Sequence, residues 1–100
     1  MADVSLQTSV RVSDDVVVRE LDGEAIILNL ASGVYFGLDP VGTRMWQLIG
    51  RLACLKDVLA AMRDEYDAPA ETIERDLLQL VSELTEKGLV TRIEAGTTDF

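Results

Sequence analysis

The side chains of this sequence that could perform acid–base chemistry are carboxylates that stand close together in the chain. They are Asp14 and Asp15, Asp64 and Glu65, and Glu83 and Glu86. Acid–base catalysis by two carboxyl groups requires that both converge on one pocket, where their pKa values are driven apart. These six fall in predicted loops and on predicted exposed helix faces, so we interpret them as solvated surface charge.

Other residue types that carry catalytic or ligand-binding chemistry are scarce. The chain has no histidine, which excludes His-based acid–base catalysis, His-activated nucleophiles and most transition-metal sites. Cys54 is the one cysteine, so no internal disulfide forms, and we expect a small apolar filler there. Gly33, Gly37 and Gly42 match neither nucleotide-binding fingerprint. We therefore expect no catalytic residue, no cofactor and no metal ligand.

The charge balance narrows the class of partner. The net charge is −9 at pH 7, with nine Lys and Arg residues. Proteins that neutralise phosphates need clustered cations, so nucleic acid and anionic membranes are poor partners. Cationic peptides are better ones, although solubility is the simpler interpretation of the charge. The N-terminus lacks signal-peptide features and no apolar run is long enough to span a bilayer, so we expect a cytoplasmic protein.

Residues 28–40 favour binding through the polypeptide backbone over catalysis. They predict the end of one strand, a turn at residues 31–33, a short strand over residues 34–38, and a helix that begins at Asp39 and Pro40. No strong strand signal follows, so we expect one side of the short strand to stay unpaired. An unpaired strand edge offers N–H and C=O groups to another chain, which predicts capture of a peptide.

Two earlier strands must position this edge. A β-branched strand over residues 16–21 and an apolar strand over residues 24–30 flank Asp22-Gly23, a dipeptide typical of a tight hairpin turn. Residues 25–28 are apolar on both faces, which predicts a central strand that is covered on each side.

Three helices follow the strands. Asp39 is expected to cap the first, in which Trp46 is interpreted as a core anchor. The second covers about residues 55–66 and the third about residues 70–87, with Gly88 as its C-cap.

Segregated strands and helices predict an α+β fold. We expect a three-stranded antiparallel sheet followed by a three-helix bundle that is similar to a winged helix-turn-helix, with a brief additional strand at residues 89–91. One domain is expected over residues 14–93. A flexible arm is expected over residues 1–13, and a flexible tail over residues 94–100.

The third helix carries one leucine outside its core stripe. At 100° per residue, one apolar stripe holds Ile73, Leu77, Leu80, Val81 and Leu84. Leu78 lies about 100° from the centre of that stripe, among polar neighbours. Leu78 therefore either lines a groove or widens the core contact. The sequence also leaves two locations for Tyr35 on the short strand, because its side chain fits either the core or a groove.

The order of these pieces resembles the PqqD family, small peptide-chaperone domains also called RiPP recognition elements. The pieces that carry the resemblance lie within residues 14–92 and are Leu28-Asn29-Leu30, Gly33, Tyr35-Phe36, Leu38, Trp46, and Leu84 followed by Gly88-Leu89-Val90. The resemblance implies three antiparallel strands on a winged three-helix bundle. It also implies binding of the leader segment of a ribosomally synthesised precursor peptide. That leader is then presented to a protease, cyclase or radical enzyme, in a lasso-peptide pathway or in quinone-cofactor (PQQ) biosynthesis.

The resemblance further implies a binding site. The leader is expected to add as a fourth strand beside residues 34–38, in a groove against the third helix. The expected peptide-binding residues are Val34, Tyr35, Phe36, Gly37, Leu38, Glu71, Glu74, Arg75, Leu78, Val81 and Ser82. In this arrangement the apolar members select apolar leader residues, and Glu71, Glu74 and Arg75 select charged ones.

A winged helix-turn-helix transcription regulator is the alternative. Its recognition helix would be residues 70–87, where two cations stand against five carboxylates: Arg75 and Lys87 against Glu71, Glu74, Asp76, Glu83 and Glu86. Base readout depends on cationic contacts to phosphates that position the helix. DNA would repel this helix, so a peptide partner is favoured.

Overall fold

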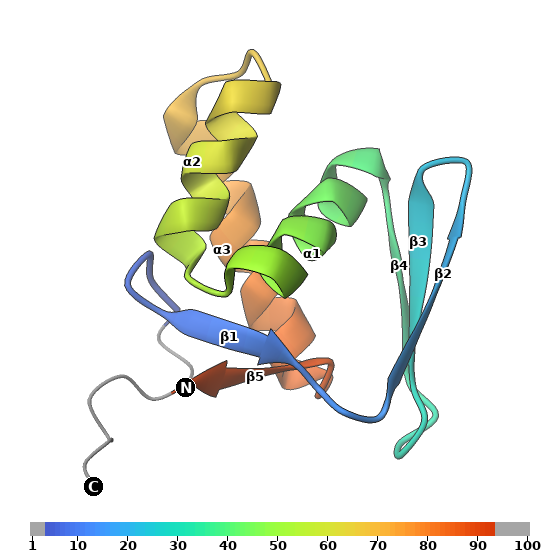
Figure 1. The fold of residues 1–100 in the computed structure, drawn as a ribbon. Coiled ribbons are helices and arrows are strands. Elements are labelled where there is room, and N and C mark those ends of the chain that lie inside the picture. The colour runs from blue at the N-terminus through green and yellow to red at the C-terminus, as the bar shows by residue number, and fades with distance from the viewer. Residues whose placement is uncertain (1–3, 94–100) are drawn as a thin grey trace, which may run out of the picture.

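The computed structural model describes residues 4–93. Its elements in chain order are β1 (Ser9–Val12), β2 (Val16–Leu21), β3 (Glu24–Asn29), β4 (Tyr35–Leu38), α1 (Pro40–Leu52), α2 (Leu55–Glu65), α3 (Ala70–Glu86) and β5 (Val90–Ile93). They form a two-stranded sheet, β1–β5, and a three-stranded sheet in the order β2–β3–β4. Figure 1 shows α1 between the three-stranded sheet and α2. The fold is α+β, as predicted.

Two tight turns build the three-stranded antiparallel sheet. Asp22 and Gly23 have φ of 56° and 80°, the left-handed values that this hairpin turn requires. At the next turn Gly33 has φ of 77°, and Asn29 Oδ1 accepts a hydrogen bond from the N–H of Ala31 at 2.9 Å. Both predicted hairpins are confirmed, and β4 is left at the edge of the sheet.

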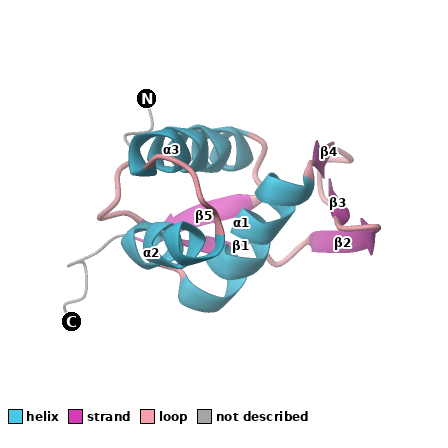
Figure 2. Cartoon of the chain, turned by 90° about the horizontal axis from the view of Figure 1, so that it is seen from above, coloured by secondary structure: helices cyan, strands magenta, loops and turns pink. Residues whose placement is uncertain are grey.

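Only one face of the three-stranded sheet is covered. Ala25, Ile27 and Leu38 are buried on the face that packs against α1, whereas Ile26 is 56% exposed on the opposite face. The prediction that this central strand is covered on each side is therefore wrong. The sheet stands to one side of the helices (Figure 2), which leaves its outer apolar residues without cover.

The start of α1 is capped and also fastened to the sheet. Asp39 Oδ1 accepts a hydrogen bond from the N–H of Gly42 at 2.7 Å, and a proline occupies the first helical position. The hydroxyl of Thr43 accepts from the N–H of Ala25 at 2.9 Å and donates to the C=O of Leu38 at 3.4 Å. This hydroxyl holds α1 where β3 begins and β4 ends.

The core lies among the three helices and the inner face of the sheet. Trp46 is 6% exposed, which confirms its place as a core anchor. Four residues of the predicted stripe on α3 are buried: Ile73, Leu77, Val81 and Leu84. The fifth, Leu80, is only partly buried against the core.

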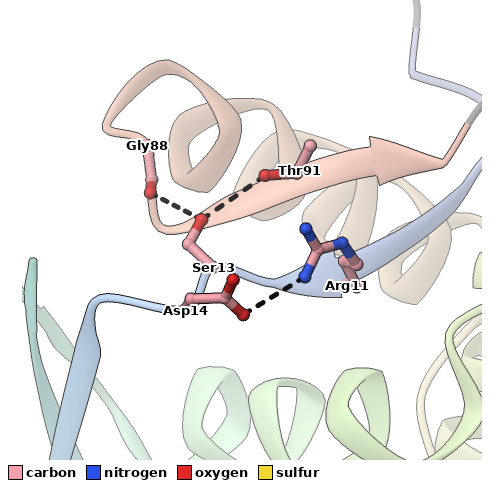
Figure 3. Close-up of polar contacts among 5 residues, drawn as sticks. All are labelled: Arg11, Ser13, Asp14, Gly88 and Thr91. Carbon is pink, nitrogen blue, oxygen red and sulfur yellow. Dashed lines mark hydrogen bonds and ion pairs between the residues drawn. The ribbon is translucent and has the colours of Figure 1, made fainter.

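The segment before β2 is ordered by a partner from the far end of the chain. Ser9–Val12 pairs antiparallel with β5, and Val10 is completely buried. Ser13 Oγ then donates a hydrogen bond to the C=O of Gly88 at 2.8 Å and lies 3.5 Å from Thr91 Oγ1 (Figure 3). The expectation of a flexible arm over residues 1–13 is therefore wrong for Ser9–Val12, which form strand β1. The brief strand expected at residues 89–91 is present as β5.

Two expectations fall on parts of the chain that the structure does not describe. The tail expected over residues 94–100 lies outside the described residues, and so do the first three residues of the expected arm. Among residues 4–93, no helix combines the length and apolar character needed to cross a bilayer.

Candidate functional site

The outer edge of β4 has no strand beside it within residues 4–93. The N–H of Asn29 donates to the C=O of Val34 at 2.8 Å, so Val34 directs its carbonyl toward β3. Hydrogen-bonded pairs alternate along an antiparallel ladder, and the register of β3 with β4 is regular. The backbone groups of Phe36 and Leu38 therefore face β3, whereas those of Tyr35 and Gly37 face outward from the edge.

An open groove of about 590 Å³ lies along this edge. Its apolar lining comes from three elements: Phe36 and Leu38 of β4, Val41 and Met45 of α1, and Leu80 of α3. Its polar lining consists of Asp39, Asp76, Gln79 and Glu83. The groove thus combines unpaired backbone groups, an apolar lining and a rim of carboxylates.

Asn29 holds the two walls of the groove together at one end. Its Nδ2 donates to the C=O of Gly88 at 3.2 Å and approaches the C=O of Lys87 at 3.5 Å. The same side chain is only 8% exposed. The end of β3 is therefore bonded to the end of α3, and β4, which is bonded to β3, is held beside α3. In the sequence Asn29 stands within the motif of residues 28–30, and nothing there indicates this role.

The charges along the groove are unevenly distributed. Asp39 is occupied as the cap of α1, whereas the side-chain carboxylates of Asp76 and Glu83 form no hydrogen bond or ion pair with another described residue. Lys87 Nζ lies 5.7 Å from the centre of the Phe36 ring, a cation–π contact at the start of β4. The lining itself contains carboxylates and no lysine or arginine.

A bidentate ion pair stands apart from the groove and joins α1 to α2. Arg44 Nε and Nη2 donate to the two carboxylate oxygens of Glu65, each at 2.7 Å. Hydrogen bonding from Arg44 lowers the pKa of Glu65, and burial of the pair opposes this to a smaller degree. Neither residue lines the groove, so this pair contributes to stability and not to the site.

The structure places the predicted residues of β4 as follows. Phe36, Gly37 and Leu38 line the groove. Val34 lies just before β4, in the turn, and Tyr35 is 71% exposed on the outer face of the sheet. All five stand at or beside the free edge, and only three of them reach the groove.

The predicted residues of α3 are not brought to β4. Glu71, Glu74, Arg75 and Leu78 line a separate depression of about 350 Å³, which shares no lining residue with the groove. Val81 is completely buried in the core, and Ser82 is partly buried and lines neither depression.

The predicted and observed groove walls lie on opposite flanks of α3. Leu78 and Leu80 are two residues apart, and hence about 200° apart around the helix, on either side of the buried stripe. From the helical periodicity, Leu80 was predicted to belong to the buried stripe and Leu78 to line the groove. In the structure the α3 wall of the groove is formed by Asp76, Gln79, Leu80 and Glu83, and none of these four residues was among the predicted binding residues.

The groove offers binding surfaces more than reactive groups. Its lining residues are apolar side chains, glycines, three carboxylates and one amide. Within the described residues, no group of three or more His, Cys, Asp and Glu side chains is arranged to hold a metal ion. An extended peptide can meet every feature of this site, since it can pair with the edge, fill the apolar lining and contact the carboxylates.

Two solved structures are similar to the chain over most of its length. The structure of TbiB1 in complex with the TbiA(beta) leader peptide is 36% identical in sequence, with a TM-score of 0.75, and the match covers 89% of this chain and 99% of that one. The structure of lasso peptide synthetase B1 complexed with the leader peptide is 25% identical, with a TM-score of 0.73, and covers 83% and 98%. No curated protein matches the chain.

A family model gives the same assignment from sequence. The model for coenzyme PQQ synthesis protein D (PqqD) matches residues 24–90. This stretch contains β3, the free edge of β4 and all three helices, and therefore both walls of the groove. The chain belongs to the PqqD family.

Proposed function

We propose that this chain binds the leader segment of a ribosomally synthesised precursor peptide and presents it to a maturation enzyme, without performing chemistry itself. The observation that carries the proposal is the unpaired edge of β4 beside an apolar groove. Support comes from the two similar structures, both of proteins in complex with leader peptides.

The binding mode that fits this edge is addition of a strand. The outward N–H and C=O groups of Tyr35 and Gly37 pair with the backbone of an extended leader, which becomes the fourth strand of the sheet. Backbone pairing of this kind gives affinity with little dependence on the leader's sequence. It also satisfies edge groups that otherwise bond only to water.

Selectivity then comes from side chains of the leader. Successive side chains of a strand point to opposite faces, so every second leader residue faces the groove. There the side chain meets Met45 of α1 and Leu80 of α3, which favour an apolar residue. The remaining leader side chains lie on the outer face of the sheet, next to Tyr35.

The chemistry of maturation belongs to a partner. The chain has no histidine, and the groove holds no nucleophile paired with a base. The partner is a protease, a cyclase or a radical enzyme that acts on the delivered precursor. The similarity to lasso peptide synthetase B1, which is 25% identical to this chain, favours a lasso-peptide pathway over quinone-cofactor synthesis.

The first step of the test is to search next to this chain's gene for a short open reading frame that encodes a precursor peptide, and the second is a calorimetric titration with the two halves of that peptide. The leader half should bind with saturable heat and a stoichiometry of one leader per chain. The core half and a scrambled leader should give only heats of dilution. Mass spectrometry should find the leader unchanged after incubation. Equal binding of leader and scrambled leader, or no binding of the leader, would refute the proposal.

A further inference from the structure

The rim of the groove carries a charge pattern that specifies more than an apolar peptide. Three carboxylates line the groove, from Asp39, Asp76 and Glu83, and no lysine or arginine lies among the lining residues. The side-chain carboxylates of Asp76 and Glu83 have no hydrogen bond or ion pair with another described residue. The whole chain adds to this field, since its net charge is −9.

Asp76 stands away from Lys87, whereas Glu83 lies only four residues, about one helical turn, before it. Asn29 bonds to the C=O of Gly88, so the C-terminal end of α3 lies beside the start of β4, where Lys87 covers the Phe36 ring. Asp76 lies eleven residues earlier on α3, which is about 16 Å along the helix axis. It lines the groove together with Asp39, the residue that follows β4. The Leu38 end of the rim therefore carries Asp39 and Asp76, and Glu83 lies nearer to Lys87 at the other end.

Resting on the proposed leader-binding function, we propose that the groove selects an extended segment that carries a lysine or arginine next to its apolar residues. The basic side chain extends over Leu80 and places its cationic head between the carboxylates of Asp76 and Glu83. Long basic side chains suit this position because their methylene stems pack on apolar surface while the charged head stays at the rim. An acidic residue in the same place meets like charge and is disfavoured.

A selection from random peptides tests this inference and does not require the natural leader. A phage-displayed library of random peptides about 20 residues long, enough to extend past both ends of a four-residue edge strand, is panned on the wild-type chain and on two charge variants. The first variant, Asp76→Lys with Glu83→Lys, reverses the rim. The second, Asp64→Lys with Asp67→Lys, makes the same change in net charge at exposed positions outside the groove. Circular dichroism checks that both remain folded.

The expected result is a change in which peptides are selected. Wild type and the Asp64→Lys/Asp67→Lys control should both enrich lysine and arginine near the apolar residues. The Asp76→Lys/Glu83→Lys variant should lose that preference and enrich aspartate and glutamate. A selected basic peptide should bind this variant roughly five- to thirty-fold more weakly than wild type, as expected for two rim charges.

The outcomes separate this inference from the proposed function. A selected peptide is taken to require the β4 edge if it no longer binds the Gly37→Pro variant, in which an outward N–H of that edge is removed. If such peptides are selected without any charge preference, or if the two charge variants select alike, the inference is wrong and strand addition stands. If no selected peptide requires the edge, the proposed function is wrong and the inference falls with it.

Discussion

Asn29 and Gly88 are joined by a hydrogen bond of 3.2 Å from the side-chain amide to the backbone carbonyl, across 59 residues of sequence. This bond holds the end of the three-stranded sheet against the end of α3. A Cβ at position 88 would lie 3.1 Å from Asn29 Nδ2, and Gly88 has φ of 73°, so the contact also depends on a glycine. The Asn29–Gly88 contact therefore sets the distance between the two walls of the groove, β4 and α3, at this end.

Substitution of Asn29 should therefore affect both stability and binding. Asn29→Asp keeps the oxygen that accepts from Ala31 but loses the donor to Gly88, and it places a carboxylate against carbonyl oxygens. A loss of roughly 1–3 kcal/mol in the free energy of unfolding is expected, with weaker leader binding. Urea unfolding and calorimetry measure the two effects. Ala31→Ser, which changes an exposed side chain in the same turn and keeps the N–H that donates to Asn29, is the control. An Asn29→Asp variant as stable as this control would show that the bond does not hold the walls.

The two flanks of α3 can be separated by matched substitutions. Leu80→Glu should lower leader affinity by about 10- to 100-fold, because roughly 1.5–3 kcal/mol of apolar burial is lost. Leu78→Glu, on the other flank, should bind the leader like wild type, and Leu77→Glu should unfold the domain because it buries an unpaired charge. Melting curves and leader titrations are compared for all three. The reverse order for Leu78 and Leu80 would restore the flank that the sequence suggested.

Strand addition predicts a contrast at a single glycine. Gly37→Pro removes an outward N–H and leaves the bonds to β3, since proline is tolerated at a strand edge when its nitrogen faces away from the ladder. Leader affinity should fall by about tenfold, the value of one hydrogen bond in a largely desolvated pair. Gly37→Ala keeps the N–H, and its Cβ would meet no atom within 4 Å, so it should bind normally. Equal affinity of the two folded variants would argue against backbone pairing at this residue.

The ion pair of Arg44 with Glu65 predicts a pH-dependent stability. Its hydrogen bond holds the folded pKa of Glu65 below the ordinary value of 4.5. The pair therefore stabilises the fold above about pH 4.5, and this contribution is lost as the pH falls through the folded pKa. Glu65→Gln should be less stable than wild type at pH 7, and the difference should shrink as the pH falls below 4.5. Urea unfolding over a series of pH values measures this, and a difference that does not change with pH would contradict the assignment.

The acidic surface of α3 predicts no retention of DNA. Asp76, Glu83 and Glu86 lie on the helix that would have to enter the major groove in the alternative function, and the net charge of −9 opposes any contact with phosphates. An electrophoretic mobility-shift assay at low salt should show free duplex at all protein concentrations. Tight binding that weakens as salt rises would favour the transcription regulator.

The local parts of the fold were predictable because their signals are local. Asp22-Gly23 predicted a turn with two positive φ values, and Asp39 with Pro40 predicted the start of α1, which the structure confirms. β1 was missed because four residues with a short alternation become a strand only through β5, about 80 positions later. The exposed outer face of β3 was missed because an apolar run does not tell how many faces the helices cover.

The site was predictable to the level of elements and not of side chains. A free edge at residues 34–38 was predicted from the order of strands, and the structure shows β4, Tyr35–Leu38, with one edge unpaired within residues 4–93. The choice between Leu78 and Leu80 depends on where β4 stands around α3. That position is fixed by long-range contacts such as Asn29 with Gly88, which no periodicity within the helix reveals.

Hydrogen exchange at β4 tests the central claim most directly. The amide protons of Tyr35 and Gly37 face outward in the free protein, whereas that of Phe36 faces β3 and serves as the internal control. Saturation with the precursor leader should slow exchange at Tyr35 and Gly37 by about tenfold or more, with little change at Phe36. Bound leader, shown by calorimetry in the same sample, together with unchanged exchange at Tyr35 and Gly37, would contradict strand addition at this edge.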